Sequence, residues 1–240
     1  MKIGLVGLGY WGKNIARNLN DLGVLYAICD SNKNTLSNYK KIYKNVRVYE
    51  EIDALVNSEV DAIFIATPAA THKELIEFFL YKDKDVFVEK PLCLDVSDGI
   101  YLKNLAYKRG LKLMVGHLLL YHPAFIALKS FLKSGGLGRL RYIYSNRLSL
   151  GKLRKEENAL WSFAPHDISM ILSLVESEPV NIEASGGYYL TADVADTTIT
   201  NLTFKDGIKA HIFVSWLHPF KDQRLVIVGE KAMATFQDIE

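Results

Sequence analysis

Short apolar runs, many of them β-branched, alternate with segments of helical periodicity through the first half of the chain. The apolar runs predict strands of a parallel sheet, because helices that cover both faces of such a sheet leave few polar positions. This alternation indicates an α/β, doubly wound domain of the Rossmann type. The predicted strands are residues 2–7, 25–30, 47–49, 62–66, 85–89 and 112–115, and the predicted helices are residues 13–22, 33–43, 52–56, 72–81 and 96–109.

The pattern changes after Gly116. Residues 123–133 and 164–175 have helical periodicity, residues 139–150 predict one long strand, and residues 180–236 predict long strands joined by polar turns. Grouped strands of this kind predict an α+β domain with an open, mostly antiparallel sheet. We therefore expect a Rossmann domain over residues 1–117 and an α+β domain over residues 118–240.

Composition narrows the class of protein. Hydrophobic residues make up 49% and charged residues 23% of the chain, as in ordinary globular proteins. A formal net charge of +2 gives no reason to expect a nucleic-acid or membrane partner. There is no signal-peptide pattern, and Cys29 and Cys93 lie beside apolar runs, which favours two reduced thiols in a cytoplasmic protein. The six histidines are scattered, so no metal site is expected.

A glycine motif follows the first predicted strand. Gly7, Gly9 and Gly12 form G-x-G-x-x-G, which opens a helix. Such glycines allow a tight turn, close approach of a pyrophosphate to the backbone, and close packing of helix on strand. The helix N-terminus then offers N–H groups to the phosphates. Tyr10 and Trp11 lie within the motif and are included in the predicted cofactor contacts.

An acidic residue at the end of the second strand indicates which cofactor is bound. Asp30 lies 18 residues beyond Gly12, where a carboxylate can accept the ribose hydroxyls and would repel a 2′-phosphate. NAD is therefore expected rather than NADP, although the nearby Lys33 could favour the phosphate.

The ends of the fourth and fifth strands carry further polar residues. Ligands of open α/β sheets lie beyond the carboxyl ends of the strands. Thr67, Pro68 and His72 follow the fourth strand, where turn and cap chemistry is as good an explanation as cofactor contact. Glu89 and Lys90 end the fifth strand, and Lys90 would place an ammonium beside the nicotinamide.

The combination of "VGLGYWGKN", Asp30, "TPAATH", "VEKP" and a following "GH" resembles the glucose–fructose oxidoreductase/inositol dehydrogenase/MocA family over the whole chain. The resemblance implies an oxidoreductase that acts on a secondary alcohol of a sugar or cyclitol. It also implies that Lys90 lies in the active site and that His166, within "NALWSFAPHDISMIL", is the second catalytic residue.

The stretch around His166 departs from the family pattern. Many relatives have Asp four residues before this His and another three residues after it, where this chain has Ser162 and Ser169. Asp167 follows His166 directly. The group that orients the histidine therefore stays open at the level of sequence.

A subgroup resemblance indicates the substrate. "GHLLLYHPAF", "YSNRLSLGKLRKEENALWSFAPHDIS" and "SWLHPF" are similar to UDP-N-acetylglucosaminuronate 3-dehydrogenases of bacterial surface-polysaccharide clusters. A UDP-sugar acid needs cations, and the basic stretch from Arg147 to Lys155, with Arg154, could supply them. Tyr121 and His122 are the other predicted substrate contacts, beside Lys90 and His166.

Two alternatives remain from the sequence. One is a cyclitol or free-sugar dehydrogenase, for which the basic stretch would have no use, and the other is a non-catalytic NAD-binding regulator. Members of the family are longer than this chain, so we expect an incomplete second sheet. Its uncovered apolar face and edge are expected to cause self-association or poor solubility, and a homo-oligomer is expected.

Overall fold

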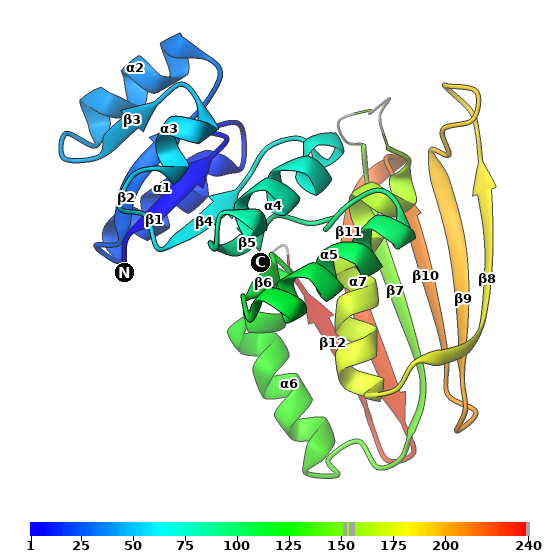
Figure 1. The fold of residues 1–240 in the computed structure, drawn as a ribbon. Helices are drawn as coiled ribbons and strands as arrows, with labels where there is room; N and C mark the ends of the chain where they lie inside the picture. Colours follow the sequence, from blue (N-terminus) through cyan, green and yellow to red (C-terminus); the bar gives the residue numbers. More distant parts are fainter. Residues whose placement is uncertain (151–152, 154–156, 239–240) are drawn as a thin grey trace. The chain divides into compact units, whose positions relative to one another are not determined.

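The computed structural model describes residues 1–150, 153 and 157–238 (Figure 1). The chain divides into two compact units, Met1–Gly116 (unit 1) and His117–Glu240 (unit 2). Each unit has its own six-stranded sheet and its own hydrophobic core.

Unit 1 is built on a parallel sheet with the strand order β3-β2-β1-β4-β5-β6. The order reverses between β1 and β4, and ligands of such sheets bind beyond the strand ends at this switch point. The predicted Rossmann fold is therefore confirmed. The strands are β1 (Ile3–Val6), β2 (Leu25–Cys29), β3 (Arg47–Tyr49), β4 (Ala62–Ile65), β5 (Asp85–Val88) and β6 (Leu113–Val115). The helices are α1 (Gly12–Asp21), α2 (Lys33–Ile42), α3 (Ile52–Val56), α4 (His72–Tyr81) and α5 (Val96–Arg109), with a 3₁₀ turn η1 (Ala69–Thr71) before α4.

Alternate residues of these strands enter two different buried clusters. Leu5 packs with Ile15 of α1, whereas its neighbour Val6 packs with Ile76 of α4. Successive strand residues point to opposite faces of a sheet, so both faces of this one are covered. This explains why the strands appear in the sequence as continuous apolar runs.

Unit 2 has the strand order β12-β11-β7-β10-β9-β8. Four of its five neighbouring pairs are antiparallel, and β7 pairs with β10 in parallel. The expected open, mostly antiparallel sheet is confirmed. The strands are β7 (Leu140–Leu150), β8 (Pro179–Gly187), β9 (Thr197–Phe204), β10 (Lys209–Ser215), β11 (Leu217–Gly229) and β12 (Met233–Gln237). The helices are η2 (Leu118–Tyr121), α6 (Pro123–Lys133) and α7 (Ala159–Val175).

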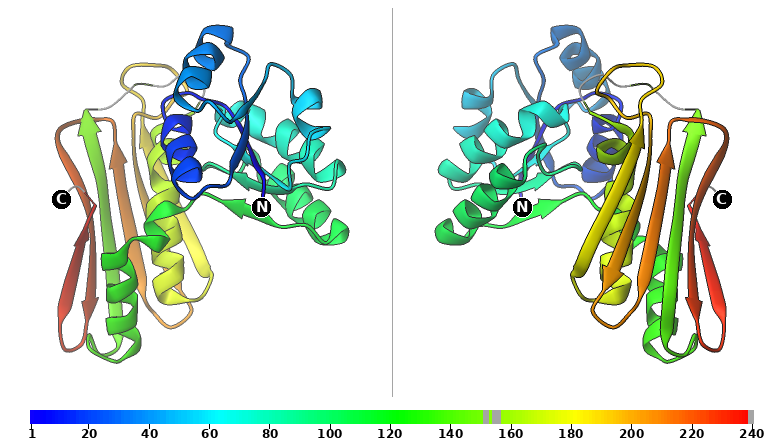
Figure 2. Two further views of the ribbon diagram at one scale, coloured as in Figure 1. Left: turned by 90° about the vertical axis from the view of Figure 1, so that its left-hand side faces the viewer. Right: turned by 90° about the vertical axis from the view of Figure 1, so that its right-hand side faces the viewer.

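The helices α6 and α7 lie on one face of the second sheet, and the opposite face carries none of the described helices (Figure 2). Ile143 and Ile212 are buried in the core with Met170 of α7. Tyr142 and Ile199, from β7 and β9, are exposed. The alternation of buried and exposed positions expected for a sheet covered on one face is therefore present.

Helix α7 begins at Ala159, five residues before the predicted start at 164. The side chain of Asn158 caps it by accepting from the Trp161 N–H at 3.1 Å. Pro165 lies inside the helix. Because proline has no backbone N–H, it costs one backbone hydrogen bond within this helix.

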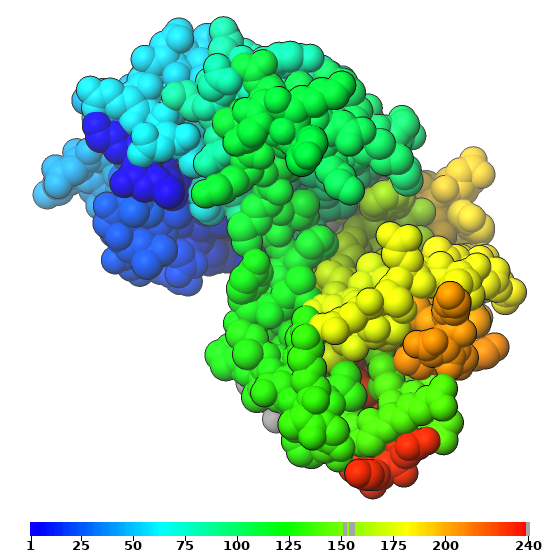
Figure 3. Space-filling view, turned by 60° about the horizontal axis from the view of Figure 1, so that its bottom comes forward, coloured from blue at the N-terminus to red at the C-terminus, as the bar shows by residue number. Residues whose placement is uncertain are grey.

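The turn before β7 packs against the β11–β12 turn. The carbonyls of Leu137 and Arg139 accept the backbone N–H groups of Lys231 and Glu230, each at 3.0 Å. Figure 3 shows the corresponding light green and red surfaces in contact. The β11–β12 hairpin is thereby fixed to the start of the central strand.

Candidate active site

Three glycines shape the loop between β1 and α1. Gly7 has a φ of +90°, and a Cβ there would lie 2.8 Å from the carbonyl carbon of Ala66. A Cβ on Gly12 would lie 2.1 Å from the carbonyl oxygen of Gly7, so only glycine allows this packing of α1. A Cβ on Gly9 would meet nothing within 4 Å. The backbone at Gly9 therefore faces open space, as a site for a phosphate at a helix N-terminus requires.

The carboxylate of Asp30, just after β2, is hydrogen-bonded to this loop. One oxygen accepts the Leu8 N–H at 2.7 Å and the other accepts the Asn32 N–H at 2.8 Å. Each oxygen keeps a lone pair, so the carboxylate can still accept a ribose hydroxyl. The ammonium of Lys33 pairs with Glu50 at 2.8 Å, which gives its charge a partner within unit 1.

The segment after β4 is held by its own hydrogen bonds. The Thr71 hydroxyl lies 2.7 Å from Thr67 Oγ1 and 2.8 Å from the Pro68 carbonyl oxygen. His72 is only 1% exposed, with Nδ1 2.7 Å from the Pro91 carbonyl oxygen and Nε2 3.0 Å from that of Thr67. Both ring nitrogens therefore face backbone oxygens, and the direct cofactor contact predicted for His72 does not fit this geometry.

Glu89 and Lys90 lie directly after β5. The indole N–H of Trp11 donates to Glu89 Oε1 at 2.8 Å and so joins the glycine loop to the end of β5. Burial raises the pKa of the Glu89 carboxyl above its usual range, and the hydrogen bond from Trp11 acts in the opposite direction. The peptide bond from Lys90 to Pro91 is cis. Tyr10 is 84% exposed, with the Lys13 ammonium over its ring.

These residues fit a dinucleotide. The open backbone at Gly9 suits a pyrophosphate, and the remaining lone pairs of Asp30 suit a ribose. Both lie at the carboxyl ends of β1 and β2, next to the switch point of the sheet.

In unit 2, His166 lies on α7 and is partly buried. Asp167, its neighbour, is 1% exposed and accepts from Arg147 Nε at 2.8 Å, from Arg147 Nη2 at 3.3 Å and from the Ser145 hydroxyl at 2.5 Å. Arg147 Nη1 also donates to Asp238 at 2.9 Å. This network ties α7, next to His166, to strand β7 of the sheet. The adjacent "HD" was the only signal for it in the sequence.

The position of Arg147 corrects one expectation. Arg147 was expected in a basic stretch facing the substrate, but it lies within β7 and is 6% exposed, with both neighbouring carboxylates bonded to it. Its charge is compensated inside unit 2, so it is a poor ligand for a substrate. Arg154, with Lys152 and Lys155, falls outside the described residues.

Tyr121 and His122 lie at the start of α6. Tyr121 is 63% exposed, so its ring can reach a ligand. His122 caps the helix instead, because its Nδ1 accepts the Ala124 N–H at 3.2 Å and its ring packs edge-on against Phe236. The substrate contact predicted for His122 therefore competes with a structural role.

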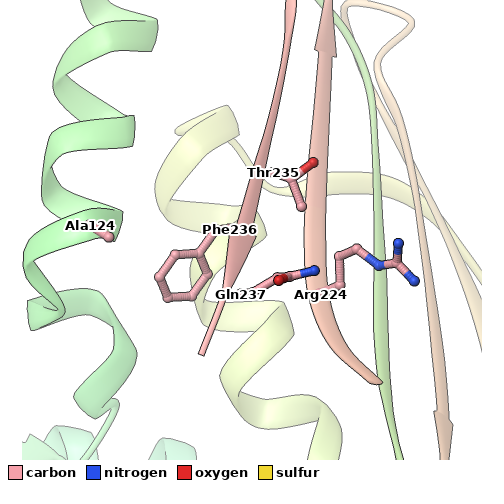
Figure 4. Close-up of a pocket in the computed structure, with 5 residues that line it drawn as sticks. All are labelled: Ala124, Arg224, Thr235, Phe236 and Gln237. Carbon is pink, nitrogen blue, oxygen red and sulfur yellow. The ribbon is translucent and has the colours of Figure 1, made fainter. Parts of the chain in front are cut away.

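A hollow of about 500 Å³ lies near this region of unit 2 (Figure 4). It contains none of the predicted site residues. The lining residues are Ala124, Arg224, Thr235, Phe236 and Gln237.

Comparison with known proteins shows the family. Residues 1–117 match the oxidoreductase family with an NAD-binding Rossmann fold, and residues 125–235 match the Gfo/Idh/MocA C-terminal domain. The chain belongs to the Gfo/Idh/MocA oxidoreductase family. The predicted family, the NAD cofactor and the class of enzyme, a dehydrogenase acting on CH–OH groups, are thereby confirmed.

Two relatives in this family illustrate the range of substrates. The UDP-N-acetylglucosamine 3-dehydrogenase of Acidithiobacillus ferrooxidans is 30% identical over 216 residues, which cover 90% of this chain and 67% of the relative. Its solved structure has a TM-score of 0.88 at 28% identity and is covered to 76% by this chain, which is itself covered to 99%. The myo-inositol 2-dehydrogenase of Thermotoga maritima is 26% identical over 245 residues, which cover 96% of this chain and 73% of the relative.

A third comparison concerns the fold alone. The structure of scyllo-inositol dehydrogenase from Lactobacillus casei, with bound NAD(H) and scyllo-inositol, has a TM-score of 0.88 at 22% identity, with coverage of 100% of this chain and 75% of that chain.

Among the residues that the structure describes, no helix is long and apolar enough to cross a membrane.

Proposed function

We propose that this protein uses NAD⁺ to oxidise the 3-hydroxyl of a UDP-N-acetylglucosamine-type sugar nucleotide, in the biosynthesis of a bacterial surface polysaccharide. The observation that carries the proposal is the similarity to the UDP-N-acetylglucosamine 3-dehydrogenase, which extends over 90% of this chain. The same reaction position was expected from the subgroup motifs around His166.

Two residues carry the chemistry in this proposal. His166 takes the proton of the substrate hydroxyl as general base, and Lys90 hydrogen-bonds the same oxygen and stabilises the developing negative charge. NAD⁺, when bound, supplies the hydride acceptor. Asp167 is hydrogen-bonded to Arg147 and Ser145, so it supports His166 through the helix backbone.

The substrate carboxylate is a separate part of the proposal. The sequence favoured a sugar acid because of the basic stretch from Arg147 onward, and Arg147 is now engaged with Asp167 and Asp238. We propose that discrimination between UDP-N-acetylglucosaminuronate and UDP-N-acetylglucosamine depends on Arg154. If Arg154 binds the carboxylate, the neutral sugar has about 10- to 100-fold lower kcat/KM, because the cation is left without its partner.

The test is NADH formation with both UDP-sugars, with myo-inositol and with glucose. Lys90→Ala and His166→Ala should each lower kcat by about 100-fold or more and leave NADH binding intact. Lys103→Ala, which changes an exposed lysine on α5, is the matched control and should keep full activity. Turnover of inositol with no response to either UDP-sugar would replace this proposal by the cyclitol dehydrogenase that the Thermotoga relative represents.

A further inference from the structure

Both chain neighbours of Lys90 are anchored to other segments of unit 1. On one side, Glu89 accepts the indole N–H of Trp11, at the start of α1. On the other side, the carbonyl oxygen of Pro91 lies 2.7 Å from Nδ1 of His72, at the start of α4. The backbone of Lys90 is thus held between the glycine loop and the segment that follows β4.

The second anchor bridges two backbone carbonyls. His72 is 1% exposed, and its Nε2 lies 3.0 Å from the carbonyl oxygen of Thr67. Carbonyl oxygens can only accept, so the ring donates to the carbonyl that faces its N–H group, while the ring as a whole contacts both segments. A buried histidine in this position connects two loops and cannot reach a ligand itself.

The Thr67 segment is itself fixed against the glycine loop. Ala66, the preceding residue, donates its N–H to the Val6 carbonyl at 2.8 Å, and its carbonyl leaves no room for a side chain at Gly7. A continuous path of short contacts therefore runs from Gly7 through Ala66, Thr67 and His72 to the carbonyl of Pro91, the residue after Lys90.

We propose that His72 is a positioning residue, whose buried ring between the Pro91 and Thr67 carbonyls sets the place of Lys90 relative to the glycine loop. The proposal rests on the catalytic role of Lys90 proposed above. Displacing a reacting group by about 1 Å can cost about 100-fold in rate, so loss of the tie to Pro91 should reduce kcat.

Two substitutions separate the two bonds. The amide nitrogen of asparagine takes the place of Nδ1, and that of glutamine takes the place of Nε2. His72→Asn therefore keeps a donor for Pro91, and His72→Gln keeps a donor for Thr67. Both remove the ring, so loss of packing is similar in the two variants.

We expect a split between kcat and cofactor binding. His72→Gln should lower kcat by about 10- to 100-fold with little change in the dissociation constant of NADH, measured by fluorescence. His72→Asn should lower kcat by less than about threefold and weaken NADH binding, because the Thr67 segment loses its tie. Equal losses of kcat in the two variants would overturn the positioning role, since a purely structural histidine would not distinguish them.

Lys90→Ala separates this proposal from the proposed function. If Lys90→Ala keeps normal turnover, the proposed function is wrong. If Lys90→Ala is defective but the two His72 variants lose equal amounts of kcat, only the role of His72 is refuted.

If the His72 variants do not fold, ¹⁵N-histidine NMR of the unmutated protein provides the test. The ring N–H of His72 should exchange slowly with water, unlike that of the exposed His211. Fast exchange at His72 would refute its hydrogen bond to a backbone carbonyl.

Discussion

Replacing Arg147 by methionine should strongly destabilise unit 2. The side chains of Arg147, Asp167 and Asp238 are 7%, 1% and 10% exposed. Burial by itself would lower the pKa of Arg147, but the two carboxylates outweigh it, and the pKa lies above its ordinary value. Arg147→Met leaves both carboxylates near each other without their cation. Breaking a buried pair in this way costs about 3–5 kcal/mol.

Arg224→Met is the matched control. Arg224 lies on β11 and pairs with Asp222 at 2.8 Å, but the side chain is 40% exposed. Exposed pairs contribute about 0–1 kcal/mol, so the control should lose no more than that. Both variants remove an arginine from the same sheet, so the difference between their losses of stability measures the effect of burial.

Urea denaturation in a Trp11→Phe background is the assay, because the remaining tryptophans, Trp161 and Trp216, both lie in unit 2. Arg147→Met should shift the midpoint to lower urea at an unchanged slope. Adding Asp167→Asn should recover part of the loss, since one unpaired charge is removed. A loss below about 1 kcal/mol for Arg147→Met would refute the buried network and return Arg147 to the candidates for substrate binding.

Three further predictions concern unit 1. Gly12→Ala should strongly destabilise or unfold unit 1 in thermal melts. Gly9→Ala should melt normally but bind NADH more weakly, because its methyl group fills only the open space over Gly9. Equal melting temperatures of the two variants would refute the packing argument. Asp30→Ala should narrow the preference for NADH over NADPH in binding titrations, and tighter binding of NADPH by the unmutated protein would contradict the role of Asp30. Glu89 has a raised folded-state pKa, so its contribution to stability is present below its ordinary value of 4.5 and is lost as pH rises through the raised value. Relative to the unmutated protein, the free energy of unfolding of Glu89→Gln in urea should therefore increase as the pH rises above 4.5. A difference in this free energy that does not depend on pH would contradict the raised pKa of Glu89.

Local sequence patterns predicted unit 1 well, because its strands, helices and glycine loop each lie within a short stretch of sequence. Each apolar run became a strand, and the glycine motif has the spatial constraints at Gly7 and Gly12 that its spacing implies. For His72 the sequence left cap or turn chemistry and cofactor contact equally open, because these roles use the same residue types, and the geometry of the ring favours the structural role. The structural role is visible only in three dimensions, where the carbonyls of Pro91 and Thr67 face the two ring nitrogens of His72.

Long-range pairing explains what the sequence did not reveal in unit 2. Arg147 looked like a free cation because one of its partners, Asp238, is 91 residues away. The parallel pairing of β7 with β10 was also hidden, since alternating strands look the same in parallel and antiparallel sheets. The catalytic roles of Lys90 and His166 stay predictions that the proposed kinetics will test.

The place of β7 in the second sheet has a consequence for how the protein is made. Within the described part of the chain, this strand pairs with β10 and β11, which begin at Lys209 and Leu217, so it leaves the ribosome well before either neighbour exists. Its core residues, among them Ile143, must wait for partners that are far along the chain, and such non-local pairing slows folding. Unit 1 can complete its sheet by then, because β6 ends at Val115. During synthesis, the apolar face of the incomplete second sheet therefore stays uncovered longer than that of unit 1, and such exposure favours aggregation.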